Sequence, residues 1–178
     1  MPRFQESDLI FDFPASWRVR AFDDHRFYQA ISGQGLKAVD FVVLHPDGKL
    51  WLMEVKNYRP RQDEAGIPYP LTLPPPQELA QQLGQKLVDS RRILRIIDRY
   101  YQRKWYYRWR LNWSTWWLFP KRDSDLLFWN EAALRLGQEQ DVPILFLQLE
   151  AQDLYFRRSI TSCLIAGGEP WEVIEEGF

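Results

Sequence analysis

The sequence AVDFVVLHPDGKLWLMEVKN, which spans residues 38–57, contains two apolar stretches joined by a turn. Ala38–Leu44 and Leu50–Val55 are rich in β-branched, aromatic and aliphatic residues, which favour strands. Between them, Pro46 presets the backbone of the first turn residue, and Gly48 supplies the left-handed conformation that a short hairpin loop requires. These residues predict a β-hairpin, and the rest of the fold is interpreted around it.

The segments on either side of this hairpin predict a mixed α/β (α+β) domain. After a polar, proline-rich stretch that predicts a loop at 57–76, apolar residues recur at helical spacing over 77–103. They predict a long amphipathic helix that covers a sheet. Further expected elements are an extended segment at 9–13, a half-buried strand at 17–22, a helix at 130–140, a buried strand at 143–149 and a helix around 160–165. We expect residues 1–178 to form one domain.

The length of the turn fixes which residues of the hairpin face each other. If residues 46–48 form a three-residue loop, Asp40 lies opposite Glu54. Opposite residues of an antiparallel pair point to the same face, with Cβ atoms about 5 Å apart. Lys56, two residues beyond Glu54, shares that face. The hairpin is therefore predicted to bring two carboxylates and one ammonium group together.

Two carboxylates in this position repel each other, and each raises the pKa of the other unless a cation compensates. Lys56 is one such cation, and a divalent ion is another. Mg²⁺ or Mn²⁺ would take the oxygens of Asp40 and Glu54, the backbone carbonyl of Val55, waters and substrate phosphates as ligands. Asp40, Glu54 and Lys56 are the predicted catalytic residues, and Lys56 would orient the attacking water or neutralise the transition state.

These residues also resemble a known family. Val39-Asp40-Phe41, followed by LMEVKN at 52–57, is similar to the motif of the PD-(D/E)XK nuclease superfamily, which includes type II restriction enzymes, archaeal Holliday-junction resolvases and nuclease-related NERD domains. The resemblance implies a restriction-endonuclease-like fold of order αβββαβ. Its mixed sheet would have the hairpin at the centre and helices at its flanks. The order of elements agrees over residues 17–149, and the motif itself covers residues 40–56.

The chain departs from the family pattern upstream of this motif. Val39 stands where many members have Pro, and the Glu that many members carry before the first strand is not placed. Candidates for that acid are Glu6, Asp23 and Asp24. Some members use a Gln or a Lys on the helix after the hairpin, and the candidates here are Gln82, Gln85 and Lys86.

An aromatic and basic segment lies at about 100–118. Interleaved Arg and aromatic residues can bind phosphates and stack bases, form a protein interface, or lie on a membrane surface. The favoured interpretation is that most rings pack in the core while the arginines extend to water. The predicted nucleic-acid contacts are Arg103, Lys104, Arg108 and Arg110, and Arg91, Arg92, Arg95 and Arg99 extend the same patch.

The composition excludes some classes of protein. The chain has 23 Lys and Arg against 24 Asp and Glu, so it is not a strongly basic nucleic-acid-binding protein. Cys163 is the sole cysteine, which excludes an intrachain disulfide and a cysteine-based zinc site. The acidic N-terminus lacks the apolar centre of a signal peptide, and no uncharged apolar stretch is long enough to span a bilayer. We expect a cytoplasmic protein.

Three functional hypotheses follow. The first is a metal-dependent nuclease that acts on DNA. The second is a catalytically inactive protein of the same fold that binds nucleic acid or another protein. The third is a protein-interaction module of another α/β fold, with the Trp-rich segment buried against a partner or in a homodimer. His25 and His45 have no partner motif and are predicted to be exposed loop residues.

Overall fold

The structure is a computed structural model, and it describes residues 3–25, 28–29, 33, 35–62, 66, 68–69, 72–103, 125–150, 153–168 and 170–175. A five-stranded sheet of order β3-β4-β5-β8-β9 forms its centre. The strands are β3 (Arg18–Ala21), β4 (Phe41–Leu44), β5 (Leu50–Asn57), β8 (Asp141–Gln148) and β9 (Glu172–Ile174). Strands β3, β4 and β5 are antiparallel, whereas β5, β8 and β9 are parallel. This mixed sheet confirms the predicted fold class.

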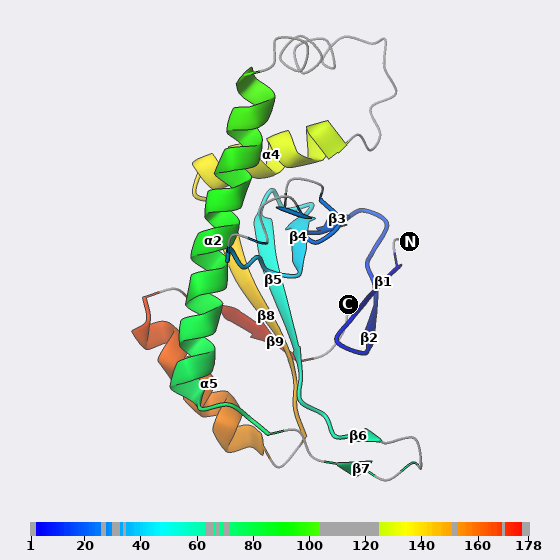
Figure 1. Cartoon of the computed structure of the whole chain (residues 1–178), viewed down its shortest axis with the longest axis vertical. Helices are drawn as coiled ribbons and strands as arrows, with labels where there is room; N and C mark the ends of the chain where they lie inside the picture. The colour runs from blue at the N-terminus through cyan, green and yellow to red at the C-terminus, as the bar shows by residue number, and fades with distance from the viewer. Residues whose placement is uncertain are drawn as a thin grey trace.

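Helices cover one face of the sheet. They are α2 (Pro76–Arg103), α4 (Asp125–Gly137) and α5 (Leu154–Ala166). Figure 1 shows α2 running the length of the sheet, with α4 near one end of it and α5 near the other. Parallel strands need a long connection, and here α2 and α4 lie between β5 and β8 while α5 lies between β8 and β9. The helix predicted from apolar spacing over 77–103 is confirmed as α2.

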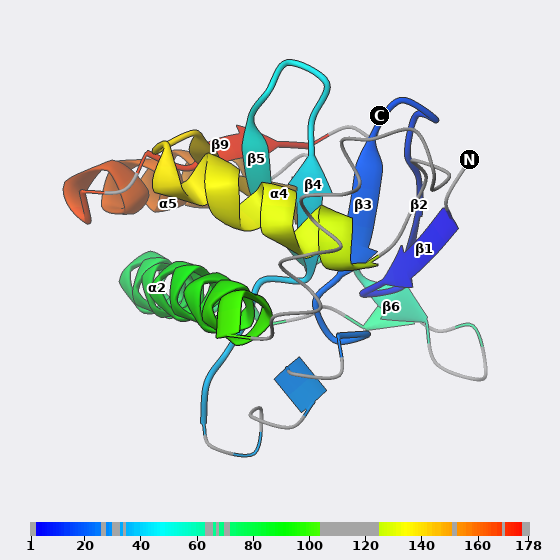
Figure 2. The same cartoon turned by 90° about the horizontal axis from the view of Figure 1, so that it is seen from above.

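A short hairpin covers the opposite face of the sheet. It consists of β1 (Arg3–Glu6) and β2 (Leu9–Asp12), and Phe11 packs with Met53 and Val55 in one apolar cluster. Leu50 and Leu52 belong to a second cluster, which contains the buried residues of α2. Figure 2 shows the helices and this hairpin on different sides of the strands. Because side chains alternate along a strand, Glu54 points to the same face as Leu50 and Leu52, which is the face that the helices cover.

Several local features differ from the predictions. Neither β1 nor β9 was expected. The β1–β2 turn was not predicted because it contains no glycine. Ser7 and Asp8 adopt the left-handed conformation instead, with φ values of 51° and 63°. The loop expected at 57–76 includes two short paired strands, β6 (Arg61–Gln62) and β7 (Pro68–Tyr69). Helices α4 and α5 begin several residues before the expected boundaries.

The two histidines were predicted to be exposed, and for His25 this was wrong. The His25 side chain is 6% exposed, because its ring packs on Trp129 of α4 with 4.5 Å between ring centroids. His45 is half-buried and stacks on Trp51, with centroids 4.4 Å apart. The His25 contact joins segments that are distant in the chain, which local sequence does not reveal, whereas His45 and Trp51 lie on the same hairpin.

Two further features bear on the sequence-based expectations. Cys163, the sole cysteine, is half-buried on α5. Within the described part of the chain, no helix combines the length and the apolar character needed to cross a bilayer.

Candidate active site

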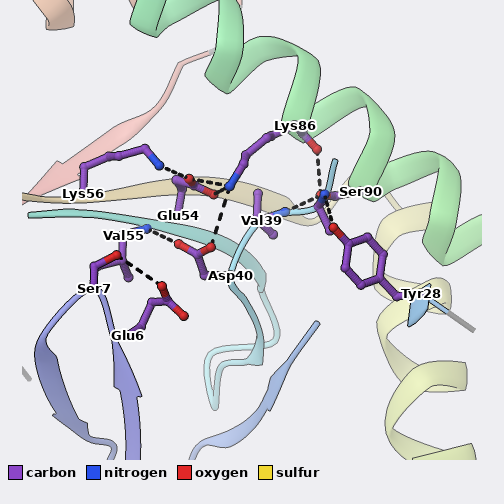
Figure 3. A network of polar contacts seen from close by, with 11 residues as sticks. Glu6, Ser7, Tyr28, Val39, Asp40, Glu54, Val55, Lys56, Lys86 and Ser90 are labelled. Atoms are coloured by element: carbon purple, nitrogen blue, oxygen red, sulfur yellow. Dashed lines mark hydrogen bonds and ion pairs between the residues drawn. The ribbon is translucent and has the colours of Figure 1, made fainter. Parts of the chain in front are cut away.

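The hairpin register places Asp40 and Glu54 on the same side of the sheet. Phe41 pairs with Met53, which is the register predicted from a three-residue turn. Asp40 immediately precedes β4, so it lies across from Glu54 of β5. Figure 3 shows the two carboxylates beside each other beneath α2.

Glu54 is a buried carboxylate held by two ammonium groups. Its side chain is 0% exposed, and the Lys56 Nζ lies 2.6 Å from its Oε1. The Lys86 Nζ donates to both oxygens, at 2.7 Å from Oε1 and 2.9 Å from Oε2. An isolated charge would be very costly at such a position, so these contacts are what permits the carboxylate there. Burial and the nearby charge of Glu54 together raise the pKa of Tyr58 to about 12.

Asp40 is held differently. Its Oδ2 accepts a hydrogen bond of 2.7 Å from the Val55 backbone N–H, and its Oδ1 lies 3.7 Å from the Lys86 Nζ. Burial and the repulsion of Glu54 raise the pKa of Asp40 from 3.8 to about 6, although Lys86 and the Val55 N–H oppose this rise. Asp40 is therefore the carboxylate whose charge can change near neutral pH.

Lys86 completes the cluster from a distant part of the sequence. It lies on α2, and its side chain is 23% exposed. Burial acts to lower the pKa of Lys86, but the carboxylates of Glu54 and Asp40 outweigh it and raise the pKa. Of the helix candidates named from the family pattern, Lys86 reaches the carboxylates, whereas Gln82 and Gln85 are exposed on α2.

The same helix fixes the segment that leads into Asp40. The Ser90 Oγ accepts a hydrogen bond of 2.9 Å from the Val39 N–H and donates one of 2.7 Å to the Lys86 carbonyl. One residue earlier, Asp89 Oδ2 accepts a hydrogen bond from the Lys37 N–H at 3.2 Å. Ser90 is fully buried and lies one helical turn beyond Lys86. It therefore sets the position of Asp40 relative to Lys86, and no sequence pattern predicted this role.

The oxygen atoms around Asp40 fit a hard divalent cation. The N–H and C=O of one strand residue point toward the same neighbouring strand. Because the Val55 N–H points at Asp40, the Val55 carbonyl is directed to the same side. Two carboxylates and a carbonyl match the ligands that Mg²⁺ and Mn²⁺ accept. Within the described residues, no group of three or more His, Cys, Asp or Glu side chains could hold a metal. A metal at this point would therefore have two carboxylates, Asp40 and Glu54, and the Val55 carbonyl as its protein ligands.

The candidates for the missing upstream acid do not join this cluster. Glu6 ends β1 rather than a helix, and its Oε1 accepts a hydrogen bond of 3.1 Å from the Ser7 Oγ. The hairpin tip is tied to β5, since the Asn57 side-chain amide donates to the Ser7 carbonyl at 3.0 Å. Figure 3 draws Glu6 on the side of Asp40, but the two residues have no direct bond. Asp23 and Asp24 are exposed in the turn after β3.

The predicted nucleic-acid contacts lie mostly outside the described residues. Arg103 is exposed at the last residue of α2. Lys104, Arg108 and Arg110, and most of the aromatic segment at 100–118, fall in the range that the structure does not describe. The structure therefore does not test whether those rings pack in the core.

Comparison of the chain with models of protein families, with characterised proteins and with solved structures finds no match. Any function must therefore be inferred from the residues and the geometry of the site.

Replacing Asp40 with Asn should remove a pH dependence from the stability of the metal-free protein. The pKa of Asp40 rises from 3.8 to about 6 on folding, so between these values the folded state binds the proton more tightly than the unfolded chain does. The free energy of unfolding of the wild type should therefore fall relative to that of Asp40→Asn as the pH rises through this interval, by about 3 kcal/mol at most, and then level off.

Urea denaturation in EDTA across this pH range measures the effect. Asp24→Asn, at an exposed position, serves as the control and should track the wild type. A difference between wild type and Asp40→Asn that is flat, or that grows in favour of the wild type with pH, would contradict the burial of Asp40 described here.

Proposed function

We propose that this protein is a divalent-metal-dependent nuclease of the PD-(D/E)XK type, which hydrolyses phosphodiester bonds in DNA. The observation that carries the proposal is the convergence of Asp40 and Glu54 beneath α2, with Lys56 and Lys86 against them. Paired carboxylates with lysines in a partly buried site suit the hydrolysis of an anionic ester, since the site can hold a cation and place positive charge near the substrate.

The order of elements supports the proposal. Strands β3, β4 and β5 are followed by α2, by the additional helix α4 and then by β8, which is parallel to β5. The resemblance implies this sequence of three strands, a helix and a strand, with Asp on the second strand and Glu-x-Lys on the third. The chain departs from the pattern before β3, where the β1–β2 hairpin stands in place of a helix.

Each residue of the cluster has a distinct role in this proposal. Asp40, Glu54 and the Val55 carbonyl would hold the ion. When bound, a divalent ion supplies an activated water and stabilises charge on the phosphodiester. Lys56 is 28% exposed at the edge of the cluster, where it can orient the water or a phosphate oxygen. Asp40 must be deprotonated to act as a ligand, so metal binding should strengthen as the pH rises through the pKa of Asp40, which is about 6 in the metal-free protein.

One observation favours a second candidate function. Both oxygens of Glu54 already accept hydrogen bonds from lysine. Two carboxylates and two ammonium groups therefore balance each other's charge without a metal. Such a closed cluster suits a catalytically inactive protein of the same fold, which would bind nucleic acid or a protein partner. The two candidates differ in whether the protein cleaves DNA and whether metal enters the cluster.

Cleavage should require both the metal and the cluster. The wild type should cut plasmid or single-stranded DNA in Mg²⁺ or Mn²⁺ but not in EDTA. Glu54→Gln and Lys56→Ala should each lower the cleavage rate about 100-fold or more. The first removes the negative charge that would hold the ion, and the second removes a positive charge beside the reacting phosphate. Glu78→Gln, at an exposed position on α2, is the matched control and should keep wild-type activity.

Circular dichroism would verify that each variant is folded. Wild-type protein that is folded but cuts no DNA in either metal would leave the inactive candidate. Cleavage that survives in folded Glu54→Gln would mean that the activity belongs to another site.

Lys86→Met should make the protein depend on metal for stability. Without Lys86, Glu54 keeps its ion pair with Lys56, and Asp40 keeps only the weaker electrostatic attraction of Lys56, so the variant should lose on the order of 3 kcal/mol in EDTA. A divalent ion would restore the missing positive charge without having to displace the Lys86 ammonium group. Mn²⁺ should therefore raise the melting temperature of Lys86→Met more than that of the wild type.

Thermal unfolding with and without Mn²⁺ gives this comparison. Lys49→Met, at the exposed hairpin turn, is the control for the loss of one lysine. An equal shift for all three proteins would show that Lys86 does not compete with the metal.

A further inference from the structure

A row of arginines lies on the outer face of α2. Arg92, Arg95, Arg99 and Arg103 are all exposed. Their spacing of three, four and four residues keeps them within about 80° of arc around the helix, since each residue turns it by about 100°. They extend over about 16 Å at 1.5 Å per residue. We call these residues the arginine stripe.

The arginine stripe faces away from the sheet. The buried residues of α2, such as Leu83, Leu94 and Ile97, occupy the opposite side of the helix. Figure 2 shows α2 nearly end-on, with the strands and helices α4 and α5 all on one side of it. The stripe is therefore open to solvent along a straight line.

None of these four arginines forms an ion pair with another described residue. Other arginines do: Arg91, on the flank of the same helix, bonds Asp141 at 2.7 Å, and Arg157 of α5 bonds Glu175 at 2.9 Å. Like charges three or four residues apart on a helix destabilise it. Although the net charge of the chain is -1, four positive charges without an ion pair to a described residue lie on one line of α2. Their mutual repulsion lowers the stability of the helix.

We propose that the arginine stripe binds the phosphate backbone of nucleic acid. A guanidinium group matches the geometry of a phosphate, and a row of them suits a ligand with charges repeated along a line. A membrane surface fits less well. An amphipathic helix binds a bilayer through its apolar face, and that face of α2 is buried against the sheet.

The stripe and the Glu54 cluster lie on opposite sides of α2. Lys86 projects from the sheet-facing side of α2 and the stripe from the outer side, so a duplex lying along the stripe is separated from Glu54 by the helix itself. The stripe therefore contributes affinity, and the cluster contributes chemistry. This inference deepens the proposed nuclease function, but binding by the stripe does not require cleavage.

The test is the salt dependence of DNA binding in EDTA. Fluorescence anisotropy would follow a labelled duplex of about 30 base pairs, and the matching single strand, between about 50 and 200 mM salt. For the wild type, log K should fall against log salt with a slope of about -3 to -4 for the duplex, as four phosphate contacts imply. Replacing Arg92, Arg95 and Arg99 together with Gln should make the slope shallower by two to three, at about 0.9 per contact.

A second triple variant separates the stripe from net charge. Arg3, Lys49 and Arg158 are exposed and scattered, so replacing them with Gln changes the net charge equally and should leave the slope near that of the wild type. An unchanged slope in the stripe variant, or an equal loss in the scattered variant, would overturn the proposal. So would wild-type binding to phosphatidylserine vesicles or polyglutamate that is as tight as binding to DNA.

Glu54→Gln separates this inference from the catalytic one. It should bind DNA with the wild-type slope while failing to cut. If the wild type cuts no DNA yet the slope depends on the stripe, the stripe inference stands and the nuclease function fails. If cleavage depends on Glu54 while the salt slope is the same in the wild type and the stripe variant, the nuclease function stands and the proposed role of the stripe fails.

Discussion

The carboxylate of Glu54 sits on a central strand with no exposed surface, and the surrounding structure is arranged to hold its charge. Two ammonium groups meet it, one from its own strand and one from α2. A carboxylate buried without such partners would destabilise the fold by several kcal/mol. The position of α2 is therefore constrained by charge as well as by apolar packing, because Lys86 must reach a single buried spot.

That constraint propagates to the second carboxylate. Ser90 lies one turn beyond Lys86 and binds the backbone just before Asp40. Asp40, the residue just before β4, in turn accepts a hydrogen bond from the Val55 N–H of β5. The helix, the hairpin and both carboxylates are thus connected through short hydrogen bonds. On the far face, the β1–β2 hairpin covers the apolar cluster that contains Phe11, Met53 and Val55, and it is tied to the end of β5 through Asn57.

The sequence predicted the hairpin half of this site well. A proline and a glycine at the turn fixed the register, and the register alone placed Asp40 opposite Glu54 with Lys56 on the same face. Lys86 was only one of three candidates, because helical spacing tells which residues share a face but not how far along a strand the helix sits. Ser90 gave no signal, since a buried serine on a helix is recognised only by what it bonds.

The missed elements have a similar cause. Strand β1 carries polar residues and turns without glycine, and the burial of His25 depends on Trp129, more than one hundred residues away in the chain. The arginine stripe was visible as a run of basic residues on a helix. Its separation from the carboxylates became clear only when the buried side of α2 was known.

In the proposed function, Asp40 and Glu54 form a metal site, and the Lys86 ammonium group takes the place of the ion when none is bound. Anomalous diffraction from crystals grown with Mn²⁺ tests it most directly. We expect an anomalous peak about 2.2 Å from oxygens of both carboxylates, with the Lys86 ammonium group moved away from Glu54. Crystals that show no peak there at saturating Mn²⁺, with Lys86 still bonded to both oxygens of Glu54, would contradict it.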